Sequence, residues 1–358
     1  MRQEDWLWYA NVLGNNAQNT GAVLARYETP EALLSAKNTV PQELSASQLE
    51  VLNSTSPSEF IKTVTQCKSL GVGIVNYSEP SYPEALRDIT NPPPVLYYKG
   101  DITILNNYFL FAIIGTRRPS GYGIEVTRDI AKVLTKAGVV LVSGLAEGLD
   151  SEAHKAAIAE EMPTVACLAF GHSYCYPAQN RTLKAIIEQV GVTISEYPPE
   201  VSPQKAYFLA RNRIIAGISR GVCVAEARRA SGTMNTVGFA LEYGKDIFSV
   251  PGSIYSPMSE GTNALLREGA SPVTSASDIL DAYAISISNI KEDTAPALDF
   301  SFSADAAEVK IHLSPMPKSI EVLCSETKMS PAKVMACLTE LELSGAAKQI
   351  AGRQFIIQ

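Results

Sequence analysis

Residues 109–123 read FLFAIIGTRRPSGYG, an unbroken apolar run that ends in a turn rich in small and basic residues. Such a run is typical of a strand buried on both faces, and the amphipathic segment 126–137 behind it is typical of a helix. The alternation continues to about residue 281, which predicts an α/β fold built on a doubly wound parallel sheet. We expect its strands at residues 109–114, 139–143, 164–170, 192–197, 221–226 and 246–250.

The flanking segments have different patterns and predict further domains. Residues 1–72 contain apolar repeats at three- and four-residue spacing, punctuated by Asn, Ser and Pro, and predict a small helical domain. The sheet domain is expected at residues 73–282, with two additional strands within 73–100. Residues 283–304 are rich in Ser, Asp and Ala and predict a linker. Residues 305–358 predict two helices and a hairpin, the pattern of a winged-helix module.

The composition excludes several classes of protein. Of the 358 residues, 46% are apolar and 19% are charged, which is typical of a globular protein with a sizeable core. The net charge of −7 excludes a bulk polycation, so nucleic-acid binding would need a local basic cluster. No run approaches the roughly 18 apolar residues of a membrane span, and the N-terminus is acidic where a signal peptide is basic. With six cysteines and no C-x-x-C, we expect a cytoplasmic protein with reduced thiols and no membrane partner.

Small residues follow five of the predicted strands. In a doubly wound sheet, ligands bind beyond the carboxyl ends of the strands. Gly, Ser and Thr at these turns let backbone N–H groups approach a bulky anion, and the helices behind them add the positive ends of their dipoles. The sequence therefore predicts a phosphate-bearing ligand. The five turns are residues 115–123, 144–150, 171–181, 227–233 and 251–253.

Two common phosphate-binding motifs are absent. The first turn lacks G-x-G-x-x-G, and the second strand ends in Ser143-Gly144 rather than in an acid for a ribose hydroxyl. Walker A is absent because Gly244-Lys245 is followed by Asp246, so no hydroxyl is placed for Mg²⁺. These absences disfavour NAD-dependent oxidoreductases and P-loop NTPases, and we expect neither a cofactor nor a metal site.

Basic residues lie near the predicted strand ends and in one helix. The helix before residues 221–226 contains Arg211-Asn212-Arg213. If all the basic residues share one face, they form a positive groove for the phosphates of a nucleic acid. The alternative is that Arg211 and Arg213 pair with buried carboxylates such as Glu196 or Glu226. The basic residues near strand ends are Arg117, Arg118, Arg181, Arg228, Arg229 and Lys245. The aromatic residues that could stack on bases, or equally pack in the core, are Tyr122, Tyr176 and Phe208.

Candidate catalytic groups are few. His154 follows Asp150 by one helical turn, so the two could hydrogen-bond, as a structural pair or as a general base with its partner. Rossmann-like enzymes that hydrolyse nucleotide N-glycosidic bonds use an acid in a P-G-G-x-G-T-x-x-E pattern. Pro251-Gly252-Ser253 matches that pattern only in part and lacks the acid. A nucleic-acid-binding protein is favoured, and a nucleotide-processing enzyme is the alternative.

The motifs GTRRPSGYG, SGLAEGLDSEAH, YPAQN, ISEYPP, RNRIIAG, VAEARRASGT and VPGS occur in that order. Together they resemble the bacterial DNA-processing protein A (DprA/Smf) family over about residues 73–281. The resemblance implies an extended Rossmann-like fold that binds single-stranded DNA, forms a homodimer and is not an enzyme. It also implies that the protein loads the RecA recombinase on incoming DNA in natural transformation and recombination, displacing or working beside the single-strand binding protein.

The resemblance extends to the flanking modules and to individual residues. The N-terminal helices resemble the family's sterile-alpha-motif-like or helix-hairpin-helix-like module, and the C-terminal module resembles its winged helix. Arg117 matches the Arg of the first glycine loop, Arg181 the basic residue after Y-P-x-x-N, and Lys245 the basic residue of G-[KR]-x-[IV]-F. The residues expected to bind DNA are Gly115, Thr116, Arg117, Arg118, Gly121, Tyr122, Ser143, Gly144, Asn180, Arg181, Arg211, Asn212, Arg213, Ser231, Gly232, Thr233, Lys245 and Gly252.

Overall fold

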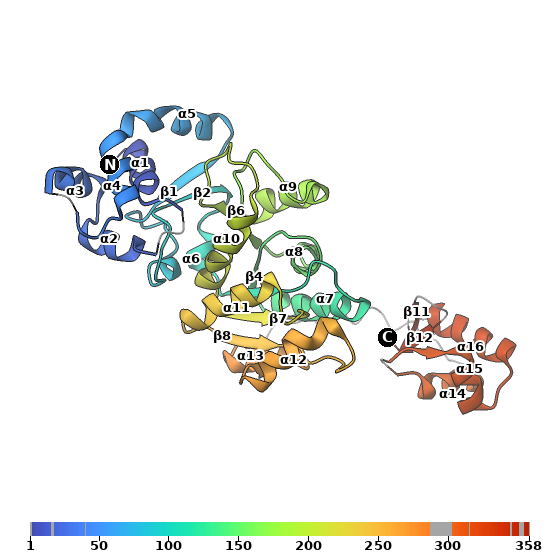
Figure 1. The fold of residues 1–358 in the computed structure, drawn as a ribbon. Helices are drawn as coiled ribbons and strands as arrows, with labels where there is room; N and C mark the ends of the chain where they lie inside the picture. Colours follow the sequence, from blue (N-terminus) through green and yellow to red (C-terminus); the bar gives the residue numbers. More distant parts are fainter. Residues whose placement is uncertain are drawn as a thin grey trace. The chain divides into compact units, whose positions relative to one another are not determined.

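The computed structural model describes residues 2–15, 18–39, 41–286, 303–314, 316–343, 346–350 and 354–357. The chain divides into two compact units, Met1–Asn289 and Ile290–Gln358 (Figure 1). Most of the linker expected at residues 283–304 lies outside the described residues, and the boundary expected after residue 72 falls inside the first unit. These domain boundaries stay predictions.

The centre of the first unit is a sheet whose described strands follow the order β1-β2-β6-β5-β4-β3-β7-β8-β9. All six strands predicted from the apolar runs are confirmed, and they pair in parallel with one another. Their carboxyl ends therefore lie along one edge of the sheet. The bounds are β3 (Leu110–Ile114), β4 (Val140–Ser143), β5 (Thr164–Leu168), β6 (Val192–Ser195), β7 (Gly221–Val224) and β8 (Asp246–Ser249).

Further strands extend the parallel block at both sides. β1 (Gly73–Asn76) pairs antiparallel with β2 (Val95–Gly100), and β2 pairs antiparallel with β6. β9 (Ser271–Pro272) pairs in parallel with β8 at the other side. The sequence pattern predicts two strands within residues 73–100 but not their partner, because strand pairing depends on contacts between distant segments.

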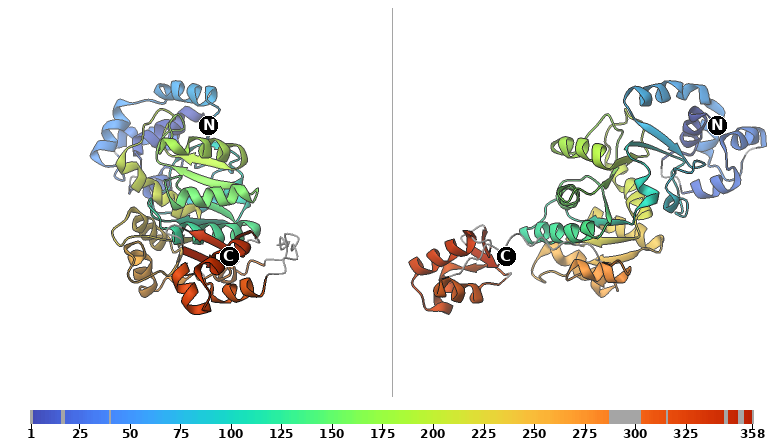
Figure 2. Two further views of the ribbon diagram at one scale, coloured as in Figure 1. Left: turned by 90° about the vertical axis from the view of Figure 1, so that its right-hand side faces the viewer. Right: turned by 180° about the vertical axis from the view of Figure 1, so that it is seen from behind.

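Helices cover both faces of the sheet, as a doubly wound fold requires (Figures 1 and 2). The helices around it are α6 (Ile104–Asn107), α7 (Gly121–Lys136), α8 (Leu149–Ala159), α9 (Arg181–Val190), α10 (Lys205–Ile218), α11 (Gly232–Glu242), α12 (Glu260–Arg267) and α13 (Ala276–Ala282). Phe111 and Ile113 of β3 pack with α7, α8 and α13, whereas Ala112 and Ile114 pack with α10 and α11. Because successive side chains of a strand point to opposite faces, both sets must be apolar, which explains the unbroken run.

The N-terminal helices build their core against the first two strands. They are α1 (Gln3–Leu13), α2 (Thr20–Arg26), α3 (Pro30–Ser35), α4 (Ala46–Ser54) and α5 (Ile61–Ser69). Trp6, Trp8 and Tyr9 of α1 are fully buried in a cluster that also contains Ile74 of β1 and Tyr97 of β2. These helices therefore continue the packing of the sheet at its antiparallel edge.

The second unit has the elements of a winged helix. Its helices are α14 (Ala304–His312), α15 (Ile320–Thr327) and α16 (Pro331–Leu343). A small sheet in the order β10-β12-β11 contains β10 (Lys318–Ser319), β11 (Ala347–Ile350) and β12 (Gln354–Ile357). The two helices and the hairpin predicted from the sequence are confirmed, and α14 and β10 are additional elements. None of the helices in the described parts of the two units is long and apolar enough to cross a membrane.

Candidate functional site

A pocket of about 800 Å³ opens at the carboxyl edge of the sheet, where the loops after β3 and β7 face each other. β3 lies between β4 and β7, so the chain winds away from it in opposite directions on its two sides. This is the topological switch point, the place where doubly wound sheets bind ligands. The expected site residues that line the pocket are Gly115, Thr116, Arg117, Arg211, Asn212, Ser231, Gly232 and Thr233.

The loop after β3 is held by backbone contacts that leave Arg117 exposed. The N–H of Thr116 donates to the carbonyl of Glu226 at 2.8 Å, and its carbonyl accepts from the N–H of Leu149 at 3.3 Å. A Cβ at Gly148 (φ 84°) would lie 2.4 Å from the carbonyl oxygen of Thr116, so only glycine permits this approach. The Arg117 side chain thus projects from a fixed backbone at the pocket wall.

The N-terminus of α7 is closed to an anion by the protein itself. The buried Glu226 carboxylate accepts from the Ser120 N–H at 2.9 Å and from the Ser120 hydroxyl at 2.6 Å. Ser120 in turn caps the helix by accepting from the N–H of Gly123 at 3.1 Å. Gly121 and Tyr122, expected as DNA contacts, lie outside the pocket lining, and the Tyr122 hydroxyl donates to the Pro251 carbonyl at 2.7 Å. The helix behind the turn at residues 115–123 was expected to add the positive end of its dipole to the ligand site, but the Glu226 carboxylate of the chain lies at that end of α7.

The N-terminus of α11, in contrast, opens into the pocket. Its cap residue, Ser231, makes no side-chain capping bond, and its buried hydroxyl has no hydrogen-bond partner among the described residues. A Cβ at Gly232 would meet nothing within 4 Å, so the space beside the first turn is empty. Asn212 fixes this turn from α10 by donating to the Gly232 carbonyl at 3.2 Å. Unpaired N–H groups and the positive end of the helix dipole make this turn suited to a phosphate.

Aromatic side chains also line the pocket. The rings of Tyr176 and Phe208 meet edge to face with centroids 5.4 Å apart, and the Arg117 guanidinium lies 5.4 Å from the Phe208 centroid. Tyr176 is 49% exposed, so its ring is available for stacking. Lys205, at the start of α10, adds an exposed cation that sequence reasoning missed, because within this helix only the Arg211-Asn212-Arg213 motif was considered.

The pocket floor contains a buried pair of opposite charges. Arg211 donates to the Gly144 carbonyl at 2.6 Å and to the Cys167 carbonyl. The Asp150 carboxylate accepts from the Gly144 N–H at 3.1 Å. Burial lowers the pKa of Arg211 and raises the pKa of Asp150, and in each case the charge of the other group opposes the shift. Most of the hydrogen-bonding capacity of Arg211 is used internally, so it supports the floor and adds positive potential.

Ser143 and Gly144 lie beneath this floor rather than at its surface. The Ser143 hydroxyl is fully buried and donates to the Ile113 carbonyl at 2.7 Å. A Cβ at Gly144 would lie 2.6 Å from the Arg211 guanidinium, so the glycine makes room for that group. Both residues were expected to bind DNA, and the structure gives them supporting roles instead.

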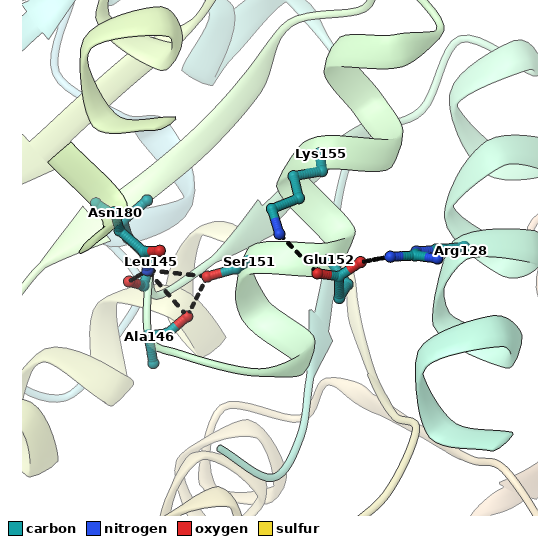
Figure 3. Close-up of polar contacts among 7 residues, drawn as sticks. All are labelled: Arg128, Leu145, Ala146, Ser151, Glu152, Lys155 and Asn180. Carbon is teal, nitrogen blue, oxygen red and sulfur yellow. Dashed lines mark hydrogen bonds and ion pairs between the residues drawn. The ribbon is translucent and has the colours of Figure 1, made fainter. Parts of the chain in front are cut away.

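Asn180 is also a supporting residue. Its side-chain amide donates to the Leu145 carbonyl at 2.9 Å and to the Ser151 hydroxyl at 2.9 Å, as Figure 3 shows. This buried amide ties the loop after β5 to the loop after β4. Arg181 follows it as the exposed first residue of α9, outside the pocket lining.

In the same view, Glu152 of α8 accepts from Arg128 of α7 at 2.7 Å and from Lys155 at 2.8 Å (Figure 3). The pair with Arg128 joins α7 to α8 at the side of the sheet opposite α10, whereas the pair with Lys155 lies within α8. They brace the two helices that follow the loops after β3 and β4.

Three further expected contacts lie away from the pocket. Arg213 is 1% exposed and forms an ion pair with the buried Glu196, which is the alternative considered from the sequence. Lys245 precedes β8 and therefore lies at the amino edge of the parallel strands, opposite the pocket. Gly252 exchanges two hydrogen bonds with the Asn263 side chain, at 3.2 and 3.0 Å. The hypothesis that all the basic residues share one face is therefore wrong, because Arg213 is buried in the first unit and Lys245 lies at the amino edge of the sheet.

The structure assigns no acid–base pair to His154 and Asp150. The His154 Nδ1 is hydrogen-bonded to the Thr164 hydroxyl at 2.8 Å, and burial lowers the pKa of His154 to about 3. Within the described ranges, no cluster of His, Cys, Asp and Glu is arranged to hold a metal ion.

Models of known protein families match most of the chain. Residues 73–284 match the family model described as DNA recombination-mediator protein A, and residues 291–353 match the DprA winged helix domain. The chain is 39% identical over 211 residues to DNA processing protein DprA of Bacillus subtilis, covering 59% of this chain and 71% of that protein.

Two solved structures share the fold. The X-ray structure of DNA processing protein A from Streptococcus pneumoniae has a TM-score of 0.62 at 32% identity, covering 78% of this chain and 98% of that one. DNA processing protein A from Helicobacter pylori, whose structure is described as giving insight into its single-stranded DNA binding mode, has a TM-score of 0.55 at 32% identity. That match covers 60% of this chain and 95% of that one.

Proposed function

The chain belongs to the DNA recombination-mediator protein A (DprA/Smf) family, and from this we propose that it binds single-stranded DNA in the pocket between the loops after β3 and β7. The observation that carries the proposal is the convergence of an exposed arginine, an open helix N-terminus and an aromatic pair on one pocket. The Helicobacter pylori relative, whose structure is described in terms of single-stranded DNA binding, supports it.

The geometry supports a specific division of labour within the pocket. A phosphate fits between Arg117 and the first turn of α11, where Ser231 and Gly232 offer a hydroxyl and unpaired N–H groups. A neighbouring base fits on the exposed ring of Tyr176, which Phe208 supports from behind. Neither contact reads a base edge, so binding should be largely independent of sequence.

Family membership supports the further proposal of a mediator role. In this proposal the DNA-bound protein, acting as a homodimer in the cytoplasm, loads the RecA recombinase on incoming DNA. It displaces or works beside the single-strand binding protein. The test is the ATPase rate of RecA on DNA coated with single-strand binding protein, which the chain should raise. Light scattering should give the mass of a dimer.

We propose that the protein acts by binding rather than by catalysis. Asp150, the buried carboxylate of the pocket, is engaged by the Gly144 N–H and faces the Arg211 charge, as a structural group does. Incubation with nucleoside monophosphates should release no free base. Release of base that is lost in Asp150→Asn would favour the N-glycosidic hydrolase instead.

The binding proposal is tested by fluorescence anisotropy with labelled single- and double-stranded oligonucleotides at low salt. Arg117→Ala should lower single-strand affinity by roughly tenfold, the value of one charge-assisted contact, without unfolding the protein. Arg220→Ala is the matched control, because Arg220 is exposed but precedes β7 at the amino edge. Wild-type affinity in Arg117→Ala, or an affinity that stays constant as KCl rises, would overturn the proposal.

A further inference from the structure

Beyond the pocket, a second exposed surface lies along the same edge of the sheet. We call it the β7–β8 rim and define it by Arg228, Arg229, Ile254 and Tyr255. Ile254 is 81% exposed and Tyr255 is 90% exposed, at the tip of the loop that follows β8. Two adjacent large side chains that remain almost fully in water have no role in the packing of this chain.

The loop that presents these side chains is held in place from both ends. The Tyr122 hydroxyl donates to the Pro251 carbonyl at 2.7 Å, and Gly252 exchanges its two hydrogen bonds with Asn263. Within the loop, the Ser256 N–H donates to the Ser253 carbonyl at 3.0 Å. The exposed tip is therefore a fixed projection, which presents a ring at a low entropic cost of binding.

The rim also brings positive charge beside the two apolar side chains. The Ala227 N–H donates to the Met258 carbonyl at 2.9 Å, which packs the turn after Tyr255 against the residue before Arg228. Arg228 and Arg229 are exposed, and neither forms an ion pair within the described parts of the chain. Along the chain, they lead directly to Ser231 at the pocket mouth. The chain therefore connects the two exposed cations of the rim to the pocket mouth through Ala230 alone.

We propose that the β7–β8 rim binds a second stretch of the same single strand that occupies the pocket. Arg228 and Arg229 hold its phosphates, a base stacks on Tyr255, and Ile254 contacts the edge of that base. Basic residues interleaved with exposed rings are the combination by which proteins hold unpaired strands regardless of sequence. The inference rests on the proposed function, because it extends the path of the DNA that the pocket binds.

Charge and geometry favour a single strand over the other macromolecules. A duplex keeps its base faces stacked on each other, so it offers no face to Tyr255. A protein partner would cover the apolar tip but would leave Arg228 and Arg229 without partners unless it were acidic. A polynucleotide satisfies both features at once, since each nucleotide carries one phosphate and one base.

The test compares oligothymidines of about 4 and about 16 nucleotides, the range that single-strand-binding folds cover. With the longer strand, Tyr255→Ala should lower affinity by roughly tenfold, the value of one base–aromatic contact, whereas Tyr255→Phe should retain it. With the shorter strand, which the pocket alone can hold, both variants should bind as wild type does. Tyr108→Ala is the matched control, since Tyr108 is 47% exposed but precedes β3 at the amino edge.

The arginines are tested by salt dependence. Replacing Arg228 and Arg229 together by Ala should reduce the slope of log affinity against log salt by about 1.4 for the longer strand, about 0.7 for each phosphate contact. If Arg117→Ala weakens both strands while the rim variants weaken neither, the rim inference fails and the proposed function stands. If the wild type binds no single strand, the proposed function fails first. Loss of duplex binding alone in the rim variants would also overturn the inference.

Discussion

The carboxylate of Glu226, two residues after β7, accepts two hydrogen bonds from Ser120, the residue that caps α7, at 2.9 and 2.6 Å. The segment after β7 thus supplies the negative charge at the N-terminus of α7, the helix that follows the neighbouring strand β3. The consequence is an asymmetry at the switch point: a carboxylate of the chain lies at the N-terminus of α7, whereas the N-terminus of α11 has no side-chain cap.

Removing the charge of Glu226 should lower stability. Glu226→Gln keeps the shape of the side chain but weakens two charge-assisted hydrogen bonds at a buried position, so we expect a loss of about 1–3 kcal/mol in the free energy of unfolding. Urea denaturation of the full chain gives this value. A stability equal to that of the wild type would show that the carboxylate is not needed to fix the start of α7.

Two glycines of α7 provide a matched test of the same contact. A Cβ at Gly123 would lie 2.2 Å from a Glu226 carboxylate oxygen, whereas a Cβ at Gly121 would meet nothing within 4 Å. Gly123→Ala should therefore cost about 1–3 kcal/mol through overpacking, and Gly121→Ala should stay within about 0.5 kcal/mol of wild type. The midpoints of thermal unfolding measure both. Equal midpoints would contradict the close approach of Glu226 to the helix.

The third prediction concerns the contribution of the buried ion pair between Arg213 and Glu196 to stability. Arg213→Ala leaves Glu196 charged in a site from which water is excluded, so it should cost about 3–5 kcal/mol of stability. Arg117→Ala, on an exposed loop residue, should change stability by less than about 0.5 kcal/mol. Replacing Arg213 by Met together with Glu196 by Leu should restore most of the loss, because no charge is then buried alone. A failure of this double variant to recover would point to a role of Arg213 beyond the pair.

The sequence predicts the parallel core well because its signal is local and strong. A strand buried on both faces must be apolar at every position, so the run at residues 110–114 cannot be mistaken for an exposed segment. The attachment of β1 and β2 to β6 is not predictable in the same way, since nothing within residues 73–100 specifies a partner that lies about a hundred residues away. Which strands pair over such a separation depends on how all the strands pack together in the sheet.

The sequence predicts at which edge of the sheet a loop residue lies, because that edge depends only on whether the residue follows or precedes a parallel strand. Arg117 follows β3, so its place at the carboxyl edge is implied by the strand itself. Lys245 precedes β8, and the same rule places it at the amino edge, although both residues lie near strand ends. Arg211 and Arg213 lie on a helix, and whether a helical side chain faces solvent or sheet depends on how α10 packs. Sequence motifs identify that such residues matter but not whether they contact the ligand or support it.

The two buried histidines of the first unit should make stability depend on pH. Burial lowers the pKa of His154 and of His172 to about 3, whereas an unfolded histidine has a pKa of about 6.5. Below pH 6.5 the unfolded chain binds protons that the folded chain does not, so stability is complete above this value and falls as the pH decreases toward 3. The expected slope is about 1.4 kcal/mol per pH unit for each histidine, or about 2 kcal/mol each at pH 5.

Urea unfolding between about pH 7 and about pH 5 measures this loss in a window where few carboxylates titrate. His154→Gln should remove about half of the slope, because the amide keeps a hydrogen-bonding group beside Thr164 without taking up a proton. Where that variant is too unstable to compare, the NMR shifts of the wild-type rings give the answer directly. They should stay at their neutral values down to pH 5. Midpoints near 6.5 for both rings would contradict the burial that positions them and would remove the predicted slope.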